Sequence, residues 1–190
     1  MIIGLTGRIA SGKNEVAKLL ADRGFEIIDV DCVGHESLTD PATVKRLTSL
    51  FGSVILINNE ISRLKLSELV FSDKSKLKQL ETVLHPVMVE KIKSIIQDTS
   101  KSFVINAAIL YEMKLDLLCD EIWVVDTPDA DIIQRLRNKG LSDDHIQSRL
   151  ETQMSRNEYS QRADRVIRNK GSLLDLKQQI DAYLDEAINN

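Results

Sequence analysis

The sequence has few cysteines, no long apolar run and no excess of positive charge, and each absence excludes a class of protein. Cys32 and Cys119 lie too far apart for a metal-binding motif, so we expect reduced thiols in a cytoplasmic protein. No apolar run reaches the roughly 18 residues of a membrane span, and the start has neither a basic leader nor a cleavage site, which predicts no membrane association. The net charge of −4 is spread over both signs and predicts no nucleic-acid partner.

The sequence also lacks internal repeats, low-complexity tracts and proline-rich linkers. Its 190 residues, 43% of them hydrophobic, are enough for one domain with a substantial core. No exposed apolar stripe stands apart from the core pattern, so a monomer is the default expectation.

Short runs rich in Ile and Val alternate with segments of helical periodicity, which is typical of a parallel sheet covered by crossover helices. The pattern predicts an α/β fold, a three-layer sandwich with a five-stranded parallel sheet. The expected strands are Ile2 to Leu5, Glu26 to Val30, Phe103 to Ile109, Glu121 to Val125 and Arg165 to Ile167. The expected helices are Lys13 to Asp22, Pro86 to Gln97, Ala130 to Asn138 and Ser172 to Ile188.

Two stretches interrupt this alternation. Residues 32–100 show helical periodicity without a convincing buried strand, which predicts a helical insertion with a short hairpin at Asn58-Asn59 and a helix from Ser62. Residues 135–162 are rich in Arg and poor in aromatic residues, which predicts a second helical segment outside the sheet. We therefore expect one domain over residues 1–190, with a core of 1–31, 101–134 and 163–190 and two appendages that move relative to it.

The pattern Gly7-x4-Gly12-Lys13 follows an expected strand and opens an expected helix, which is the context of a phosphate-binding loop. Glycines let successive backbone N–H groups point at a phosphate, and the helix N-terminus adds partial positive charge. We expect a nucleotide here. The expected ATP-binding residues are Gly7, Ala10, Ser11, Gly12, Lys13, Asn14 and Glu15, the last with its side chain pointing away.

Asn14 stands where a Ser or Thr hydroxyl normally coordinates the Mg²⁺ that accompanies ATP. An amide oxygen can also bind Mg²⁺, but the longer side chain must fit an octahedron that tolerates little displacement. We therefore predict Asn14 as the metal ligand, with weakened or unusual metal handling.

Asp29 and Asp31 end the second expected strand, two residues apart and so on one face of the extended chain. Ligands of parallel sheets bind at the carboxyl ends of strands, where a carboxylate could take a proton from an acceptor hydroxyl. The alternative is that such an Asp only caps the following helix.

Seven segments occur in the order seen in one known family: IGLTGRIASGK, IIDVDCVGHE, ISRLKLSELVF, LETVLHPVMVEKI, AAILYE, a helical segment bearing Gln153, and ADRVIRN. By these motifs the chain resembles the dephospho-CoA kinases. The resemblance covers nearly the whole chain. It implies a P-loop kinase domain that phosphorylates the ribose 3′-hydroxyl of dephospho-CoA with ATP and Mg²⁺, the last step of coenzyme A biosynthesis.

The resemblance also implies roles for residues and segments. Asp31 matches the proposed general base and Lys13 the loop lysine, while residues 32–100 would bind CoA and residues 135–162 would be a lid. Arg149, four residues before Gln153 and expected on the same helical face, is the candidate cation for the transferring phosphoryl group. The expected substrate-binding residues are Asp31, His35, Arg63, His85 and Glu112, and the further expected ATP-binding residues are Arg135, Arg137 and Asn169.

Several positions depart from the family pattern. Asn106 replaces an Asp, and Gln134 and Asn138 replace arginines, although Arg135 and Arg137 lie beside them. Because a neighbouring helical residue points about 100° away, these arginines would need the helix to rotate or shift. The alternatives are a divergent P-loop kinase with another acceptor or low activity, and a nucleotide-binding regulator without catalysis.

Overall fold

The computed structural model describes residues 1–188, which divide into two compact units. The core unit comprises residues 1–28 and 98–188, and the insertion unit comprises residues 29–97. The boundaries of the insertion unit are within three residues of those expected for the insertion, residues 32 and 100. Among the described residues, no helix combines the length and the apolar character needed to cross a membrane.

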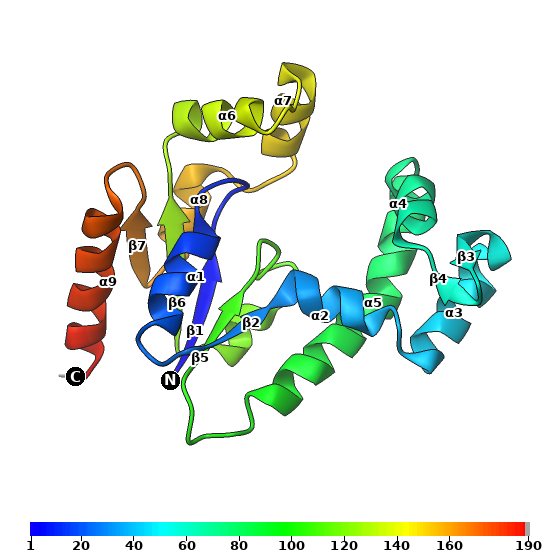
Figure 1. The fold of residues 1–190 in the computed structure, drawn as a ribbon, viewed down its shortest axis with the longest axis horizontal. Helices are drawn as coiled ribbons and strands as arrows, with labels where there is room; N and C mark the ends of the chain where they lie inside the picture. The colour runs from blue at the N-terminus through cyan, green and yellow to red at the C-terminus, as the bar shows by residue number, and fades with distance from the viewer. Residues whose placement is uncertain (189–190) are drawn as a thin grey trace. The chain divides into compact units, whose positions relative to one another are not determined.

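The core unit is built on a five-stranded sheet with the order β2-β5-β1-β6-β7 (Figure 1). Its strands are β1 (Ile2–Thr6), β2 (Glu26–Asp29), β5 (Phe103–Asn106), β6 (Glu121–Asp126) and β7 (Arg165–Arg168). β1 runs parallel to both β5 and β6, and β6 runs parallel to β7. The predicted five-stranded parallel α/β fold is confirmed.

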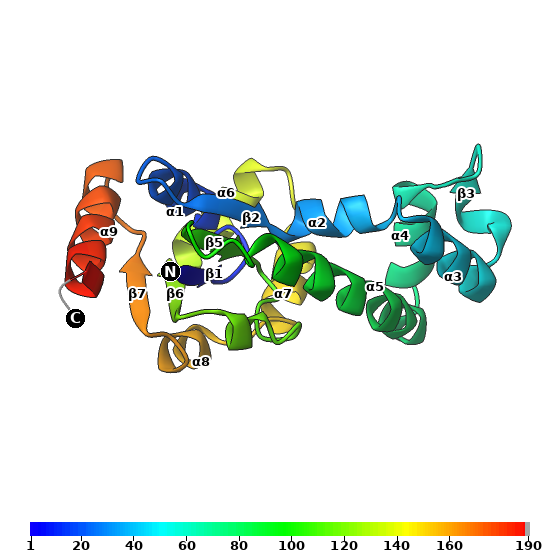
Figure 2. The ribbon, with the colours of Figure 1, turned by 90° about the horizontal axis from the view of Figure 1, so that it is seen from below.

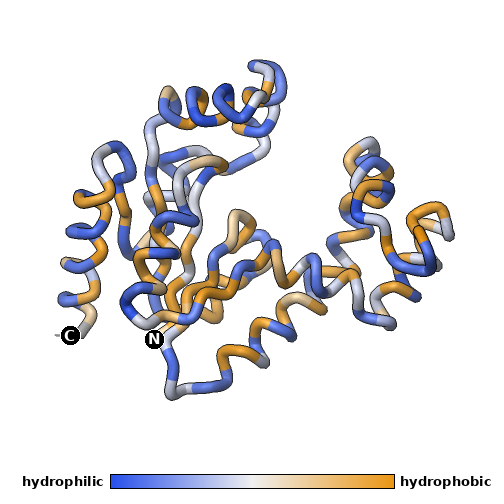
Figure 3. The backbone as a smooth tube through the Cα atoms, viewed as in Figure 1, coloured by the Kyte–Doolittle hydropathy of each residue, from blue (hydrophilic) through white to orange (hydrophobic). Residues whose placement is uncertain are grey.

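Helices cover both faces of this sheet. On one face α1 (Lys13–Ala21) and α9 (Leu173–Ile188) share a buried cluster with the strands that includes Leu5, Leu20, Trp123 and Ile180. The other face carries α8 (Arg156–Gln161) and the short helix η2 (Leu115–Leu118), and Figure 2 shows α1 and α8 on opposite sides of the sheet. Figure 3 shows mainly hydrophobic strands and helices in which hydrophobic and hydrophilic residues alternate. This is expected of three layers, because the sheet is buried and each helix has one face on the sheet and one in solvent.

Two further helices, α6 (Asp129–Asn138) and α7 (Asp143–Glu151), overlap the first part of the expected lid stretch, whereas α8 in its last part packs on the sheet rather than outside it. They share a small buried cluster of Ile132, Leu136, Ile146 and Leu150. Ile9 and Ala10, from the loop after β1, pack against the same cluster, so the two helices and the loop are in direct apolar contact.

The insertion unit has a hydrophobic core of its own. Its elements are α2 (Val30–Ser37), α3 (Pro41–Phe51), η1 (Ser53–Ile55), β3 (Leu56–Ile57), β4 (Glu60–Ile61), α4 (Arg63–Phe71) and α5 (Lys74–Ile95). Leu47, Leu66 and Val83 are among its buried residues. The expected hairpin is confirmed: Asn58 and Asn59 have φ values of 52° and 66° between β3 and β4, as a two-residue type I′ turn requires.

The structure corrects three boundaries. Pro86 does not begin a helix but lies inside α5, whose apolar residues pack on both sides of it, from Val83 to Met88 and Ile92. Burial of those side chains offsets the missing N–H of the proline, and α5 changes direction along its length, as expected for a proline inside a helix (Figure 1). The expected strand from Phe103 ends at Asn106 rather than Ile109, because the chain then turns, which leaves Ile109 exposed and buries Leu110 against Gly4 of β1.

The third correction concerns Asp29 and Asp31, which do not share one face of an extended strand. Asp29 is the N-cap of α2, and its Oδ1 accepts hydrogen bonds from the N–H groups of Asp31 (3.0 Å) and Cys32 (3.1 Å). This side-chain cap begins the helix, so Asp31 already belongs to the first turn of α2.

Candidate functional site

The loop between β1 and α1 has the curled backbone expected of a phosphate site. Gly7, Ala10 and Gly12 have φ values of 145°, 56° and 100°. A Cβ atom on Gly7 would lie 2.5 Å from Val125 O, and one on Gly12 would lie 2.1 Å from Asn169 Nδ2. Both glycines are therefore required by backbone conformation and by close packing.

Three side chains from later in the chain hold the carbonyl groups of this loop. Ser11 O accepts hydrogen bonds from Thr127 Oγ1 (2.8 Å), Asn169 Nδ2 (2.7 Å) and Arg135 Nη1 (3.2 Å). Arg135 Nη1 also donates to Ala10 O at 3.0 Å. Because the carbonyl oxygens are bound on this side, the loop conformation is fixed by α6 and by the segments that follow β6 and β7.

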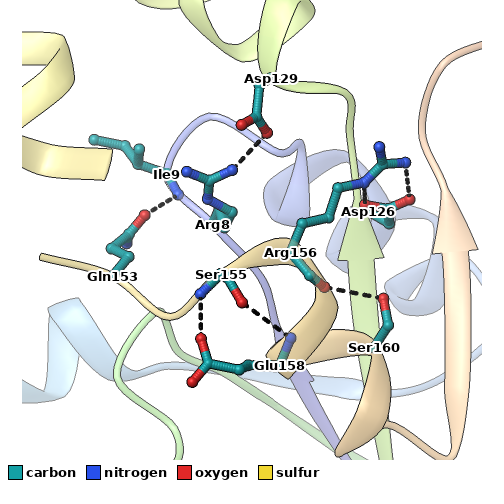
Figure 4. Close-up of polar contacts among 9 residues, drawn as sticks. All are labelled: Arg8, Ile9, Asp126, Asp129, Gln153, Ser155, Arg156, Glu158 and Ser160. Carbon is teal, nitrogen blue, oxygen red and sulfur yellow. Dashed lines mark hydrogen bonds and ion pairs between the residues drawn. The ribbon is translucent and has the colours of Figure 1, made fainter. Parts of the chain in front are cut away.

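A second set of polar contacts joins the loop to the segments around α8 (Figure 4). Arg8, which is buried, donates from Nη1 to Asp129 Oδ1 at 2.5 Å, and Ile9 N donates to Gln153 Oε1 at 2.9 Å. Beside them Arg156 binds the buried carboxylate of Asp126 with two parallel hydrogen bonds. These hydrogen bonds raise the pKa of Arg156.

Lys13 and Asn14 begin α1 directly after the loop. Lys13 Nζ donates to Gly7 O (2.9 Å) and Arg8 O (3.2 Å), which places the ammonium group over the loop. Asn14 Oδ1 accepts a hydrogen bond from Asn106 Nδ2 at 3.1 Å. Glu15 is exposed and pairs with Lys18 on the same helix, so its carboxylate is engaged along α1.

Among the described residues, no group of three or more His, Cys, Asp or Glu side chains could hold a metal ion such as Mg²⁺. Asn14 offers one neutral amide oxygen beside the loop. This donor set fits an ion that arrives with the oxygens of ATP, and it does not fit a resident metal.

The arginines expected in the lid have different surroundings. Arg135 faces the phosphate loop, whereas Arg137 is exposed and pairs with Asp143 at 2.7 and 2.9 Å, which joins the end of α6 to the start of α7. Arg149 is exposed in the last turn of α7. The expectation that Arg149 and Gln153 share a helical face is wrong, because α7 ends at Glu151 and Gln153 lies beyond it.

The expected acceptor-side residues lie mostly in the insertion unit. Asp31 and His35 are exposed and one turn apart on α2, and Arg63 is the first residue of α4. His35 and Arg63 line a cavity of about 460 Å³ within this unit, together with Lys45 and Glu60. The structure thus brings two of the expected substrate-binding residues to one cavity.

Two expected substrate-binding residues lie elsewhere. His85 is half-buried in α5, one residue before Pro86. Glu112 belongs to the core unit and is exposed in the segment after β5. Burial is the main cause that raises the pKa of Tyr159, and the negative charge of Glu112 raises this pKa further. The cavity that holds His35 and Arg63 is not lined by either residue.

Sequence reasoning missed several residues that shape the loop, namely Thr127, Asp126, Asp129 and Arg156. A usable signal was the run Asp126-Thr127-Pro128-Asp129 at the end of a buried strand, because polar residues there face the ligand edge of a parallel sheet. The pairing of these two carboxylates with Arg8 and Arg156 had no local signal, because each pair joins segments far apart in the sequence.

Comparisons with known proteins agree over the length of the chain. The sequence profile described as dephospho-CoA kinase matches residues 1–175. The dephospho-CoA kinase of Carboxydothermus hydrogenoformans is 37% identical over 192 residues, covering 97% of this chain and 93% of that protein. That of Borrelia garinii subsp. bavariensis is 38% identical over 198 residues, covering 100% and 95%.

Solved structures give the same result. A protein of Thermus thermophilus superposes with a TM-score of 0.83 at 30% identity, covering 98% of this chain and 97% of that one. The dephospho-CoA kinase of Campylobacter jejuni gives a TM-score of 0.67 at 25% identity, covering 97% and 96%. With its phosphate loop, five-stranded parallel sheet and helical insertion, this chain belongs to the dephospho-CoA kinase family.

Proposed function

We propose that this protein transfers the terminal phosphoryl group of ATP to the 3′-hydroxyl of the ribose of dephospho-CoA, the last step of coenzyme A biosynthesis. The observation that carries the assignment is the ordered loop Gly7–Gly12, held by Thr127, Arg135 and Asn169 and followed by Lys13, in a chain of this family. Such a loop serves a reaction in which positioning and charge neutralisation supply most of the catalysis.

On the donor side, the backbone N–H groups of residues 7–13 and the N-terminus of α1 bind the phosphates of ATP. Lys13 moves from the loop carbonyls that it contacts to the β- and γ-phosphates. Asn14 would hold Mg²⁺ through its amide oxygen, and an ion bound together with ATP would supply charge neutralisation at the terminal phosphates. Gly7, Ala10, Ser11, Gly12 and Glu15 contribute backbone, and Asn169 fixes Ser11 beneath the nucleotide.

On the lid side, Arg135 and Arg149 are the cations that screen the transferring group. Arg135 is already directed at the loop, and Arg149 is free of the buried cluster that fixes α7. Arg137 contributes by joining α6 to α7 through Asp143. Closure of these helices over ATP excludes water and so favours transfer over hydrolysis.

On the acceptor side, Asp31 is the general base for the ribose hydroxyl. Its place in the first turn of α2 leaves the carboxylate exposed, while Asp29 performs the capping. His35 and Arg63 bind the substrate at their shared cavity, where Lys45 adds a further cation for the phosphates of dephospho-CoA. His85 and Glu112 complete the proposed substrate contacts. We also propose that the protein works as a monomer in the cytoplasm, consistent with its free thiols Cys32 and Cys119.

The test compares Asp31→Asn with Asp29→Asn in a coupled assay of CoA formation from dephospho-CoA, ATP and Mg²⁺. Loss of a general base lowers kcat by roughly 10²- to 10⁴-fold with little change in the KM for ATP. Asp29→Asn is the matched control, because Asn caps a helix about as well as Asp. A reaction without dephospho-CoA measures ATP hydrolysis.

Two results would count against this assignment. A wild-type protein that binds ATP but forms no CoA would point to another acceptor. Equal activity of Asp31→Asn and Asp29→Asn would remove Asp31 from the role of base and leave the kinase activity standing.

A further inference from the structure

Beside the phosphate loop, two neutral amides are in direct contact, and one of them is the expected metal ligand Asn14. Asn106 ends β5 and is 7% exposed, and its Nδ2 donates to Oδ1 of Asn14 at the start of α1, 3.1 Å away. In phosphate-loop enzymes these places commonly carry a hydroxyl that ligates Mg²⁺ and a nearby carboxylate that supports it. Here one amide orients another, and neither brings a negative charge.

We propose that Asn106 is a positioning residue for Asn14, and that this amide pair forms a neutral metal site in which ATP itself supplies nearly all of the Mg²⁺ affinity. This inference assumes the ATP-dependent activity proposed above and adds how its metal is held. An amide oxygen has two acceptor positions. The hydrogen bond from Asn106 occupies one and fixes the side chain, which leaves the other for the ion.

The surrounding charges support this reading. Glu15, the nearest acidic residue in the sequence, pairs with Lys18 at 3.0 Å on the exposed side of α1. The described residues contain no cluster of acidic side chains that could take over the metal. A carboxylate within a few ångströms of a divalent cation is a large attractive contribution even at protein surfaces, so its absence lowers the hold of the protein on Mg²⁺.

The contact also makes the two positions dependent on each other. Asn106→Asp alone would set a carboxylate against the carbonyl oxygen of Asn14, two acceptors without a hydrogen between them, and would force that amide to turn. Asn14→Ser alone would present a hydroxyl to the amide of Asn106 and add no charge. Only both changes together would give a hydroxyl that donates to a carboxylate and keeps its oxygen for the ion.

The experiment measures ATP binding by titration calorimetry, in EDTA and in saturating Mg²⁺, for the wild type, both single variants and the double variant. The readout is the dissociation constant of ATP in EDTA divided by that in saturating Mg²⁺. This ratio measures how much the metal strengthens ATP binding, and it does not depend on turnover. Asn138→Asp is the control: it adds the same charge to an exposed amide pair, where Gln134 Nε2 donates to Asn138 Oδ1 at 3.0 Å on α6. Thermal unfolding of each variant verifies that it is folded.

We expect a ratio within about threefold of unity for the wild type and for Asn138→Asp, and a ratio at least tenfold larger for the double variant, about 1.4 kcal/mol or more. We expect Asn106→Asp alone to weaken ATP binding in EDTA and to give only part of this gain in Mg²⁺, because its carboxylate attracts the ion while the turned amide of Asn14 no longer presents its oxygen. The two changes should therefore be non-additive.

A wild-type ratio as large as that of the double variant would overturn the inference, as would additive effects of the two substitutions. CoA formation by the same samples tests the kinase activity separately. A wild type that forms CoA but depends strongly on Mg²⁺ for ATP binding would reject the neutral site alone, whereas a wild type that binds no ATP in either condition would reject both proposals.

Discussion

Replacing Arg135 by Met should loosen the phosphate loop, because Arg135 is the cation that binds the loop carbonyls from α6. Its guanidinium donates to Ala10 O (3.0 Å), Ser11 O (3.2 Å) and Asn169 O (3.4 Å). Ser11 O keeps the donors of Thr127 and Asn169, and Asn169 O keeps that of Thr127, so the loss is concentrated at Ala10 O.

One charge-assisted hydrogen bond to a part-buried carbonyl group is worth about 1.5–3 kcal/mol, so we expect a destabilisation of about 2 kcal/mol. In a chain of this size that lowers Tm by roughly 4–8 °C. ATP binding should weaken as well, because the loop would sample conformations whose N–H groups no longer converge. Arg135→Lys should fall in between, since an ammonium group lacks the planar fork.

The assay is thermal unfolding of Arg135→Met and Arg137→Met side by side, followed by ATP titration. Arg137 is two residues along α6 and pairs only at the surface with Asp143, so its loss should change Tm little. Equal shifts for the two variants, or no shift for Arg135→Met, would refute the claim that the contacts of Arg135 fix the loop.

Three further predictions follow from single residues. Gly12→Ala should abolish ATP binding, because its Cβ would lie 2.1 Å from the side-chain amide of Asn169. Gly24→Ala, at φ +88° with no heavy atom within 4 Å, should lower the free energy of unfolding by only about 1–2 kcal/mol through backbone strain. If calorimetry and thermal unfolding showed the same losses of ATP affinity and stability for the two variants, the packing argument would be contradicted. Burial raises the pKa of Cys119 to about 12, so iodoacetamide should label the exposed Cys32 much faster than Cys119 at neutral pH. Peptide mass spectrometry measures both rates, and equal rates in the native protein would contradict the burial of Cys119. Burial also raises the pKa of Tyr159 to about 12 from 10.0, so the folded protein keeps a proton that the unfolded chain loses, and the free energy of unfolding should fall between pH 10 and 12. Urea unfolding at pH 9 and pH 11 should show a smaller fall in this free energy for Tyr159→Phe than for the wild type. The same fall in both proteins would exclude Tyr159 as its source.

The features that sequence reasoning predicted correctly depend on local patterns. The strand before Gly7 and the helix after Gly12 could be read because hydrophobic periodicity and glycine spacing are properties of neighbouring residues. The turn at Asn58-Asn59 was equally local, since Asn tolerates positive φ. These features needed no information about distant segments.

The errors arose where distant segments compete with local preference. Proline favours the first turn of a helix, yet Pro86 lies inside α5 because apolar side chains both before it (Val83) and after it (Met88 and Ile92) are buried. The lid arginines show the same limit. Residues two apart on a helix point about 200° away from each other, so Arg135 and Arg137 could not both face the loop, and only the packing of α6 decided which one does.

The sequence by itself determined the phosphate loop, the succession of the sheet's strands along the chain, and membership of the kinase family. Each of these depends on short motifs and on their order in the sequence. Tertiary structure alone decided the partners: Asn14 with Asn106 across 92 positions, Arg8 with Asp129 across 121, and Ser11 with Asn169 across 158. The physical reason is that a hydrogen bond or an ion pair depends on where the folded backbone places two groups, and packing over the whole sheet fixes that placement.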